Sequence, residues 1–189
     1  MPFLKPLFAV TLFLSAFLMF SVQPMIGKAL LPVMGGSPSV WNTAMVFFQL
    51  LLLAGYFYAF LLSKIPSLKV QGAIHAGVIL LAAALSLPLV LKTDEVLSLA
   101  HPVGWQLDVM AGMVAAPFFV LSASAPLLQR WFSLSSHKAA ASPYSLYVAS
   151  NIGSLLALLA YPFVIERYLH LGTQASLWTF GYGGLALLI

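Results

Sequence analysis

Residues 6–27 read PLFAVTLFLSAFLMFSVQPMIG and run from Lys5 to Lys28 without a charged side chain. A transmembrane helix needs about 20 apolar residues and tolerates few charges, so this stretch predicts a membrane span. Further uncharged runs follow, separated by charged or turn-forming residues. Together they predict an all-α, polytopic membrane helix bundle that forms one domain, 1–189. The six expected transmembrane helices lie at about 6–27, 40–63, 70–91, 109–129, 143–165 and 172–189.

The composition excludes the soluble classes of protein. Hydrophobic residues make up 62% of the 189 residues and charged residues 6%, whereas soluble domains have about 45–50% and about 25%. The chain has no cysteine, which excludes disulfide frameworks and thiolate chemistry. Its basic residues are scattered singly, so the net charge of +4 predicts no nucleic-acid partner. The expected partner is the lipid bilayer.

The distribution of charge predicts the orientation of the bundle. Six spans place both termini on one side, and that side carries only basic residues: Lys5, Lys64, Lys69, Arg130 and Lys138. The other side carries Lys28, Lys92 and Arg167 together with all four acidic residues. Basic residues in short loops remain cytoplasmic, so both termini are expected in the cytoplasm.

A weak internal repeat appears at an offset of about 105 residues. Ser37-Pro38 recurs as Ser142-Pro143, and Tyr56 recurs as Tyr161. Three helices repeated as three more would lie in opposite orientations across the bilayer. Inverted repeats of this kind occur in many secondary transporters, including each half of the major facilitator fold. The alternative is chance recurrence of the residue types that are common in any apolar sequence.

Four polar residues in the second and fifth spans are candidates for a solute path. Asn42 and Gln49 are seven residues apart, and Asn151 and Ser154 are three apart, so each pair shares a helix face. Polar side chains within a membrane usually face the bundle interior. These four are therefore predicted substrate-binding residues. The alternative is interhelical hydrogen bonding, worth about 0.6 kcal/mol per contact.

Lys28 is a fifth predicted substrate-binding residue. It ends the stretch Gln23-Pro24-Met25-Ile26-Gly27-Lys28, in which Pro24 removes a backbone donor and Gly27 permits close approach of another backbone. A broken helix end beside a cation can hold an anionic group. The alternative is an ordinary helix end whose lysine reaches the lipid headgroups.

The histidines suggest the hypothesis of a haem or metal site, but their positions do not favour it. His75 falls in the third predicted helix, His101 and His170 in outer loops, and His137 in an inner loop. We expect no cofactor and no metal. The sequence also lacks the H-E-x-x-H and G-x-S-x-G motifs of hydrolases, and we expect no enzymatic activity. Small residues, Gly153 and Ala157 and the stretch 181–184, predict close helix packing.

Several longer motifs resemble those of a known family. They are QPMIGK at 23–28, LPVMGGSPSVW at 31–41, SAPLLQ at 124–129 and ASNIGSLLAL at 149–158. These stretches are similar to the membrane part of bacterial spermidine-synthase-like proteins, in which a major-facilitator-like membrane part is fused to a soluble enzyme-like part. The resemblance covers about residues 10–165 and implies a multi-pass protein of the bacterial inner membrane. It also implies a cytoplasmic enzyme domain as a possible partner, although this chain contains no such domain.

Two functions follow from these observations. The first is a transporter-like inner-membrane module that moves or binds a small solute, alone, as a homo-oligomer or beside another domain. The alternative is a structural anchor or scaffold for a soluble enzyme or partner protein. A membrane oxidoreductase is a third class that rests only on the histidines.

Overall fold

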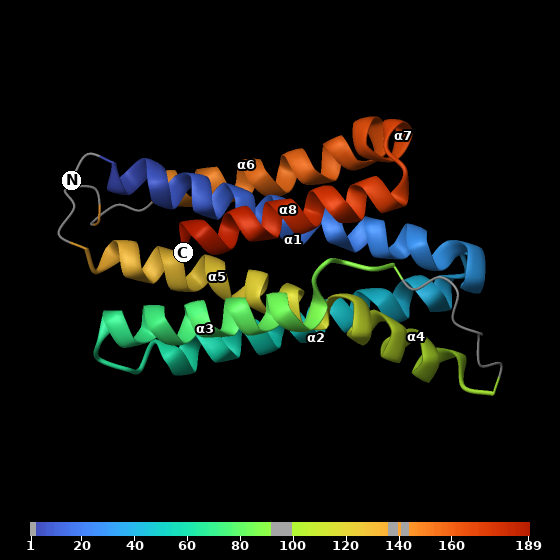
Figure 1. The fold of residues 1–189 in the computed structure, drawn as a ribbon, viewed down its shortest axis with the longest axis horizontal. Helices are drawn as coiled ribbons and strands as arrows, with labels where there is room; N and C mark the ends of the chain where they lie inside the picture. The colour runs from blue at the N-terminus through green and yellow to red at the C-terminus, as the bar shows by residue number, and fades with distance from the viewer. Residues whose placement is uncertain (1–2, 92–99, 136–139, 141–143) are drawn as a thin grey trace.

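The computed structural model describes residues 3–91, 100–135, 140 and 144–189, and the described chain is helical without a strand (Figure 1). This confirms the predicted all-α fold. The elements are α1 (Leu4–Met34), α2 (Pro38–Leu62), α3 (Leu68–Ser86), α4 (Pro102–Met110), η1 (Ala111–Ala115), α5 (Ala116–Ser133), α6 (Tyr144–Ala160), η2 (Tyr161–Ile165), α7 (Glu166–Tyr168) and α8 (Leu171–Leu188). The segments η1 and η2 are single π-helical turns within longer helices.

The first helix is longer than the sequence predicted. It runs for 31 residues and contains Pro24 and Pro32 in its interior, so the expected break near Pro24 and Gly27 is wrong. Membrane helices tolerate proline because neighbouring groups compensate for the lost backbone bond. The helix ends at Gly35, whose φ of 74° is a conformation that favours glycine. Pro38 then starts α2 in the first turn, where proline needs no hydrogen-bond partner.

The boundaries of two other spans also differ from prediction. The fourth begins at Pro102 and continues through η1 to Ser133, because Asp108, which marked the expected start near 109, lies exposed within the helix. The third ends at Ser86, not near 91, because Leu87 precedes Pro88 and is extended. Pro117 closely follows η1, and Pro162 lies within η2. These π-helical turns accommodate the missing proline N–H groups.

Helices α1 and α5 form the centre of the bundle. They contact each other, α1 also packs against α6 and α8, and α5 packs against α2 and α3. In the apolar 18-residue stretch of the α4–α5 span, 61% of the residues are buried. In the corresponding stretch of the span that contains α6, 17% are buried. The peripheral helices therefore present apolar side chains outward, as expected for a surface in contact with lipid.

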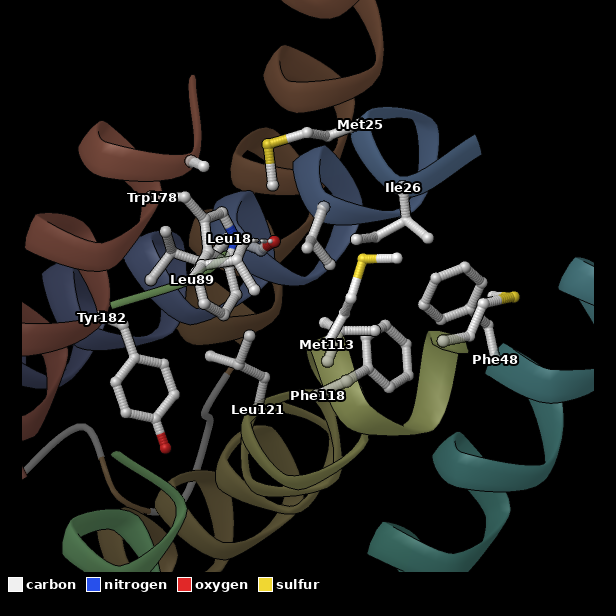
Figure 2. Close-up of a cluster of buried hydrophobic side chains, with 14 of the residues drawn as sticks. Leu18, Met25, Ile26, Phe48, Leu89, Met113, Phe118, Leu121, Trp178 and Tyr182 are labelled. Carbon is white, nitrogen blue, oxygen red and sulfur yellow. Dashed lines mark hydrogen bonds between the residues drawn. The ribbon is translucent and has the colours of Figure 1, made fainter. Parts of the chain in front are cut away.

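Figure 2 shows part of the main core, where side chains from α1, η1, α5 and α8 meet. The Trp178 indole N–H donates to the Leu18 carbonyl across 2.9 Å. The Tyr182 hydroxyl donates to the Ile79 carbonyl at 3.3 Å. These two bonds satisfy the polar ends of large buried rings and join α8 to α1 and α3.

Close packing occurs at some of the predicted small residues. Gly153 lies against the backbone of Phe13, and Ala157 is fully buried in the same α1–α6 contact. The prediction is wrong at Gly183 and Gly184, where a Cβ would have no neighbour within 4 Å. The prediction is confirmed at Gly181, where a Cβ would lie 2.9 Å from Leu18 on α1. Gly55 on α2, which was not predicted, lies equally close to the Phe119 carbonyl oxygen on α5.

The described helices are compatible with a membrane module. Five have the length and apolar character to cross a bilayer: Leu4–Met34, Pro38–Leu62, Leu68–Ser86, Pro102–Ser133 and Tyr144–Tyr168. Helix α8 has 18 residues and is not among them, because polar residues and glycines lower its hydropathy. The chain begins and ends at the same end of the bundle (Figure 1), where Leu4 and Ile189 pack on one small core cluster.

Candidate functional site: a polar groove between α2 and α6

The end of the candidate site that lies away from the chain termini, called here its outer end, contains an ion pair (Figure 1). Lys28 Nζ on α1 lies 3.2 Å from Glu166 Oε1 on α7, and both side chains are partly exposed. The pair borders a hollow of about 540 Å³, which is also lined by Gln23, Trp41 and Tyr161. Because α1 continues past Lys28, this lysine lies on the side of a helix and not at a broken helix end. Its charge is therefore balanced by a carboxylate from another helix.

The middle of the site is a narrow hollow of about 170 Å³ between α1 and α2. Two glutamines line it, Gln23 and Gln49. The Gln23 amide donates to the Met19 carbonyl at 3.2 Å. The exposed Gln49 side chain makes no hydrogen bond within the described part of the chain.

The inner part of the site is a hollow of about 440 Å³ among α1, α2, α5 and α6. Its polar lining residues are Ser15, Tyr56, Gln129, Tyr147, Ser150, Asn151 and Ser154. The Ser154 hydroxyl donates to the Asn151 backbone carbonyl at 2.9 Å. The Asn151 side-chain amide has no partner among the described residues, so its donors and acceptor remain free.

These three hollows form one continuous groove. The outer and middle hollows share Gln23, Met45 and Phe48. The middle and inner hollows share Met19, Phe20 and Leu52. We call this feature the polar groove: its floor is formed by α1 and α5, and its rims by α2 and α6.

The structure brings four of the five predicted site residues into the polar groove. Lys28 lies in the outer hollow, Gln49 in the middle, and Asn151 and Ser154 in the inner hollow. Asn42 is exposed near the outer end of α2 and lines none of the three hollows. There the α2 wall is formed by Trp41 and Met45 instead.

Sequence reasoning missed Gln23 and Gln129 as lining residues. Gln23 had a usable signal, because it lies five residues before Lys28 in an otherwise apolar helix. Gln129 immediately precedes Arg130 at the expected end of a span, so it did not stand out from an ordinary polar helix end. Its role depends on packing against α6.

None of the described histidines lines the three hollows of the polar groove. His75 is fully buried between α3 and α5, whereas His101 and His170 are exposed at helix starts. His137 lies outside the described residues. Within the described residues, no group of three or more histidine, aspartate and glutamate side chains gathers as metal ligands would.

The walls of the polar groove are mainly apolar, and its polar groups offer hydrogen bonds. Amides and hydroxyls provide donors and acceptors, and the charged groups at the outer end form a neutral pair. Comparison with known proteins gives no guide to a ligand, because no family model, curated protein or solved structure matches this chain.

Proposed function

We propose that this chain is a transporter-like membrane module that binds a small polar solute in the polar groove and moves it along the groove. The observation that carries this proposal is the continuity of the groove past the unpartnered amides of Gln49 and Asn151. Gln49 lies 11 residues after Pro38 and 13 before Leu62, close to the midpoint of α2. Placing an amide in hydrocarbon without a hydrogen-bond partner costs free energy. The position of Gln49 therefore favours contact with water or a polar solute.

The lining indicates the class of solute. The amides of Gln49 and Asn151 both donate and accept hydrogen bonds, and Lys28 and Glu166 neutralise each other at the outer end. Such a lining suits a neutral or zwitterionic solute with several hydrogen-bonding groups. It suits a polycation less, because the one acid that lines the groove within the described residues is already paired.

The packing of the helices supports an inverted repeat, which the transporter-like architecture includes. If the first three spans correspond to the last three, α1 corresponds to α5, α2 to α6 and α3 to α8. The contact of α1 with α6 then corresponds to that of α5 with α2, and the contact of α1 with α8 to that of α5 with α3. Each of these four contacts is present.

Buried polar residues support the same correspondence at an offset of 103 residues. Gln71 on α3 and Gln174 on α8 are both buried, and each caps the chain that precedes its own helix. The Gln71 amide donates to the Ile65 carbonyl at 2.6 Å, and the Gln174 amide donates to the Leu169 carbonyl at 2.8 Å. Two equivalent capping interactions are more specific support for a repeat than the recurrence of common apolar residues in the sequence.

The family and the location are part of the proposal. The motifs quoted above support membership of the membrane part of spermidine-synthase-like proteins, hence a bacterial inner membrane. The basic residues at the end of the bundle that carries both termini support a cytoplasmic location for that end. We propose no catalytic activity for this chain.

Solute binding is tested by thermal unfolding of the detergent-purified protein. Neutral amino acids, betaines and polyols, each tested alone, are the probes. A solute at 100 times its dissociation constant stabilises the folded protein by about 2.7 kcal/mol, so a binder raises the melting temperature. Gln49→Leu and Asn151→Leu should abolish that rise, whereas the matched control Asn42→Leu, a polar α2 residue outside the groove, should retain it.

Two outcomes would contradict solute binding in the polar groove. One is that none of the probes raises the melting temperature of the wild-type protein. The other is that the rise persists in both groove variants. Co-purification of a soluble enzyme together with the first outcome would favour the scaffold function instead.

A further inference from the structure

A second polar site lies on the other side of α5, around His75. This side chain on α3 has no exposed surface, and its Nε2 lies 3.2 Å from Ser124 Oγ on α5. His75 lies seven residues after Leu68, the first residue of α3, or about 10 Å along the axis at 1.5 Å per residue. A buried ionisable side chain at such a depth in a membrane span is unusual and is a candidate for function.

The hydrogen bonds of Ser124 determine which imidazole nitrogen carries the proton. The Ser124 hydroxyl donates its one hydrogen to the Val120 carbonyl at 2.7 Å. Its oxygen can therefore only accept from His75, so Nε2 is the protonated nitrogen of the neutral ring. Nδ1 is left with a free lone pair, and this buried atom has no hydrogen-bond partner among the described residues.

A matching unpartnered group faces the same ring. Tyr58 on α2 stacks on His75 with ring centroids 5.9 Å apart, and its buried hydroxyl has no hydrogen-bond partner in the described part of the chain. The other polar neighbours are already bonded. The Trp131 indole N–H donates to Gln71 Oε1 at 2.8 Å, and the Gln71 amide N–H donates to the Ile65 carbonyl.

We propose that His75 and Tyr58 form an intramembrane proton-binding site. A proton from water binds at His75 Nδ1, and no other bond is made or broken. The imidazolium then donates from Nε2 to Ser124 Oγ and from Nδ1 to the Tyr58 hydroxyl oxygen, directly or through one water molecule. The described residues leave both atoms unpartnered, and the bound proton supplies the hydrogen for a bond between them.

The groups around the site offer no competing charge. From α5, Arg130 is exposed, and its guanidinium donates to the Ser63 carbonyl at 3.0 Å. From α8, the Tyr182 hydroxyl is bonded to the Ile79 carbonyl, and η1 contains no titratable residue. No acidic side chain faces His75 from the described elements that pack on it.

Aromatic rings, and not a carboxylate, stabilise the positive charge of the protonated His75. The Tyr58 ring stacks on His75, and the Trp131 ring contacts it at a steep angle of 75° with centroids 5.9 Å apart. A cation is attracted to aromatic faces, and this attraction is stronger away from water. Helix α5 separates the site from the polar groove, because Ser124 contacts His75 whereas Ala125 and Pro126 line the inner hollow. Proton binding therefore stands independently of any solute in the groove.

Tryptophan fluorescence of the purified protein in lipid nanodiscs tests this proposal. A protonated imidazole quenches an indole that it contacts, so Trp131 reports on His75. We expect emission to fall in one step as the pH is lowered from about 8 to about 3, a window that extends below the ordinary histidine range. The step should be lost in His75→Gln and in Trp131→Phe. It should remain in the matched control His101→Gln, which removes an exposed histidine.

Tyr58→Phe separates proton binding from a structural role. It retains the histidine and removes the acceptor for the new N–H, so the midpoint should move to lower pH by about half to one unit, the effect of one neutral hydrogen bond. Nitrogen NMR of histidine-labelled protein is the second measurement and should show Nδ1 of His75 becoming protonated over the same step. An unchanged step in His75→Gln, or a His75 signal that does not titrate, would overturn the proposal.

Discussion

Substitution of Gly153 by alanine is the sharpest test of how the bundle is packed. Gly153 on α6 lies against the backbone of Phe13 on α1. An added Cβ would meet the Phe13 carbonyl oxygen and would lie 3.1 Å from its carbonyl carbon and 3.2 Å from its Cα. These three atoms belong to the backbone of a central helix, so no side-chain rotation can relieve the overlap. The two helices would have to separate along their contact.

The cost of this separation can be estimated from overpacked cores. Added methylenes in well-packed interiors cost about 1–3 kcal/mol. Because the obstructing atoms are backbone, we expect Gly153→Ala to fall at about 2–3 kcal/mol. At 1.4 kcal/mol per factor of ten, this is about a 30- to 150-fold loss in the folding equilibrium. Equilibrium unfolding by sodium dodecyl sulfate in mixed micelles, followed by circular dichroism, measures it.

The matched control is Gly184→Ala on α8, where an added Cβ has no atom within 4 Å. It should be neutral or stabilising by up to about 1 kcal/mol, since alanine has the higher helix propensity. Equal stability of the two alanine variants would refute the close α1–α6 contact.

Three further experiments test local features, all by the same unfolding measurement. Trp178→Phe removes the indole donor to the buried Leu18 carbonyl and should cost about 1–2 kcal/mol; no loss would mean that this bond is not formed. Lys28→Met and Glu166→Gln, singly and together, should give a coupling energy below about 1 kcal/mol, because the pair is partly exposed; a coupling of several kcal/mol would mean that it is desolvated. Gly35→Ala should cost about 1–3 kcal/mol, since its φ of 74° and ψ of −178° are accessible mainly to glycine, and unchanged stability would argue against this turn.

The existence of the spans could be predicted from sequence because hydrocarbon imposes strong rules on length and charge. Their ends could not. Asp108 marked a boundary by its charge, yet an exposed carboxylate near the outer end of a helix is tolerated, and the helix starts at Pro102. Pro24 suggested a break, yet α1 continues to Met34. In both cases the surroundings of the residue decide the outcome, and these are set by tertiary contacts.

The candidate site was partly predictable for a similar reason. Polar residues within an apolar span have few acceptable positions, so Gln49 and Asn151 could be placed in one path before their neighbours were known. Asn42 shares a helix face with Gln49 but lies near the end of α2, where Trp41 forms the wall. Tyr58 and His75 come from different helices, and no sequence spacing predicts their contact.

Water access to Gln49 is the most direct test of the polar groove. The natural chain contains no cysteine, so single cysteines can be introduced without background and labelled in liposomes with a membrane-impermeant, thiolate-specific reagent. Thiolates form in water and not in hydrocarbon. Gln49→Cys should react, whereas Leu50→Cys, at the same depth and 61% exposed on the outside of α2, should not. Labelling of both cysteines alike, or of neither, would contradict a water-accessible groove in this membrane module.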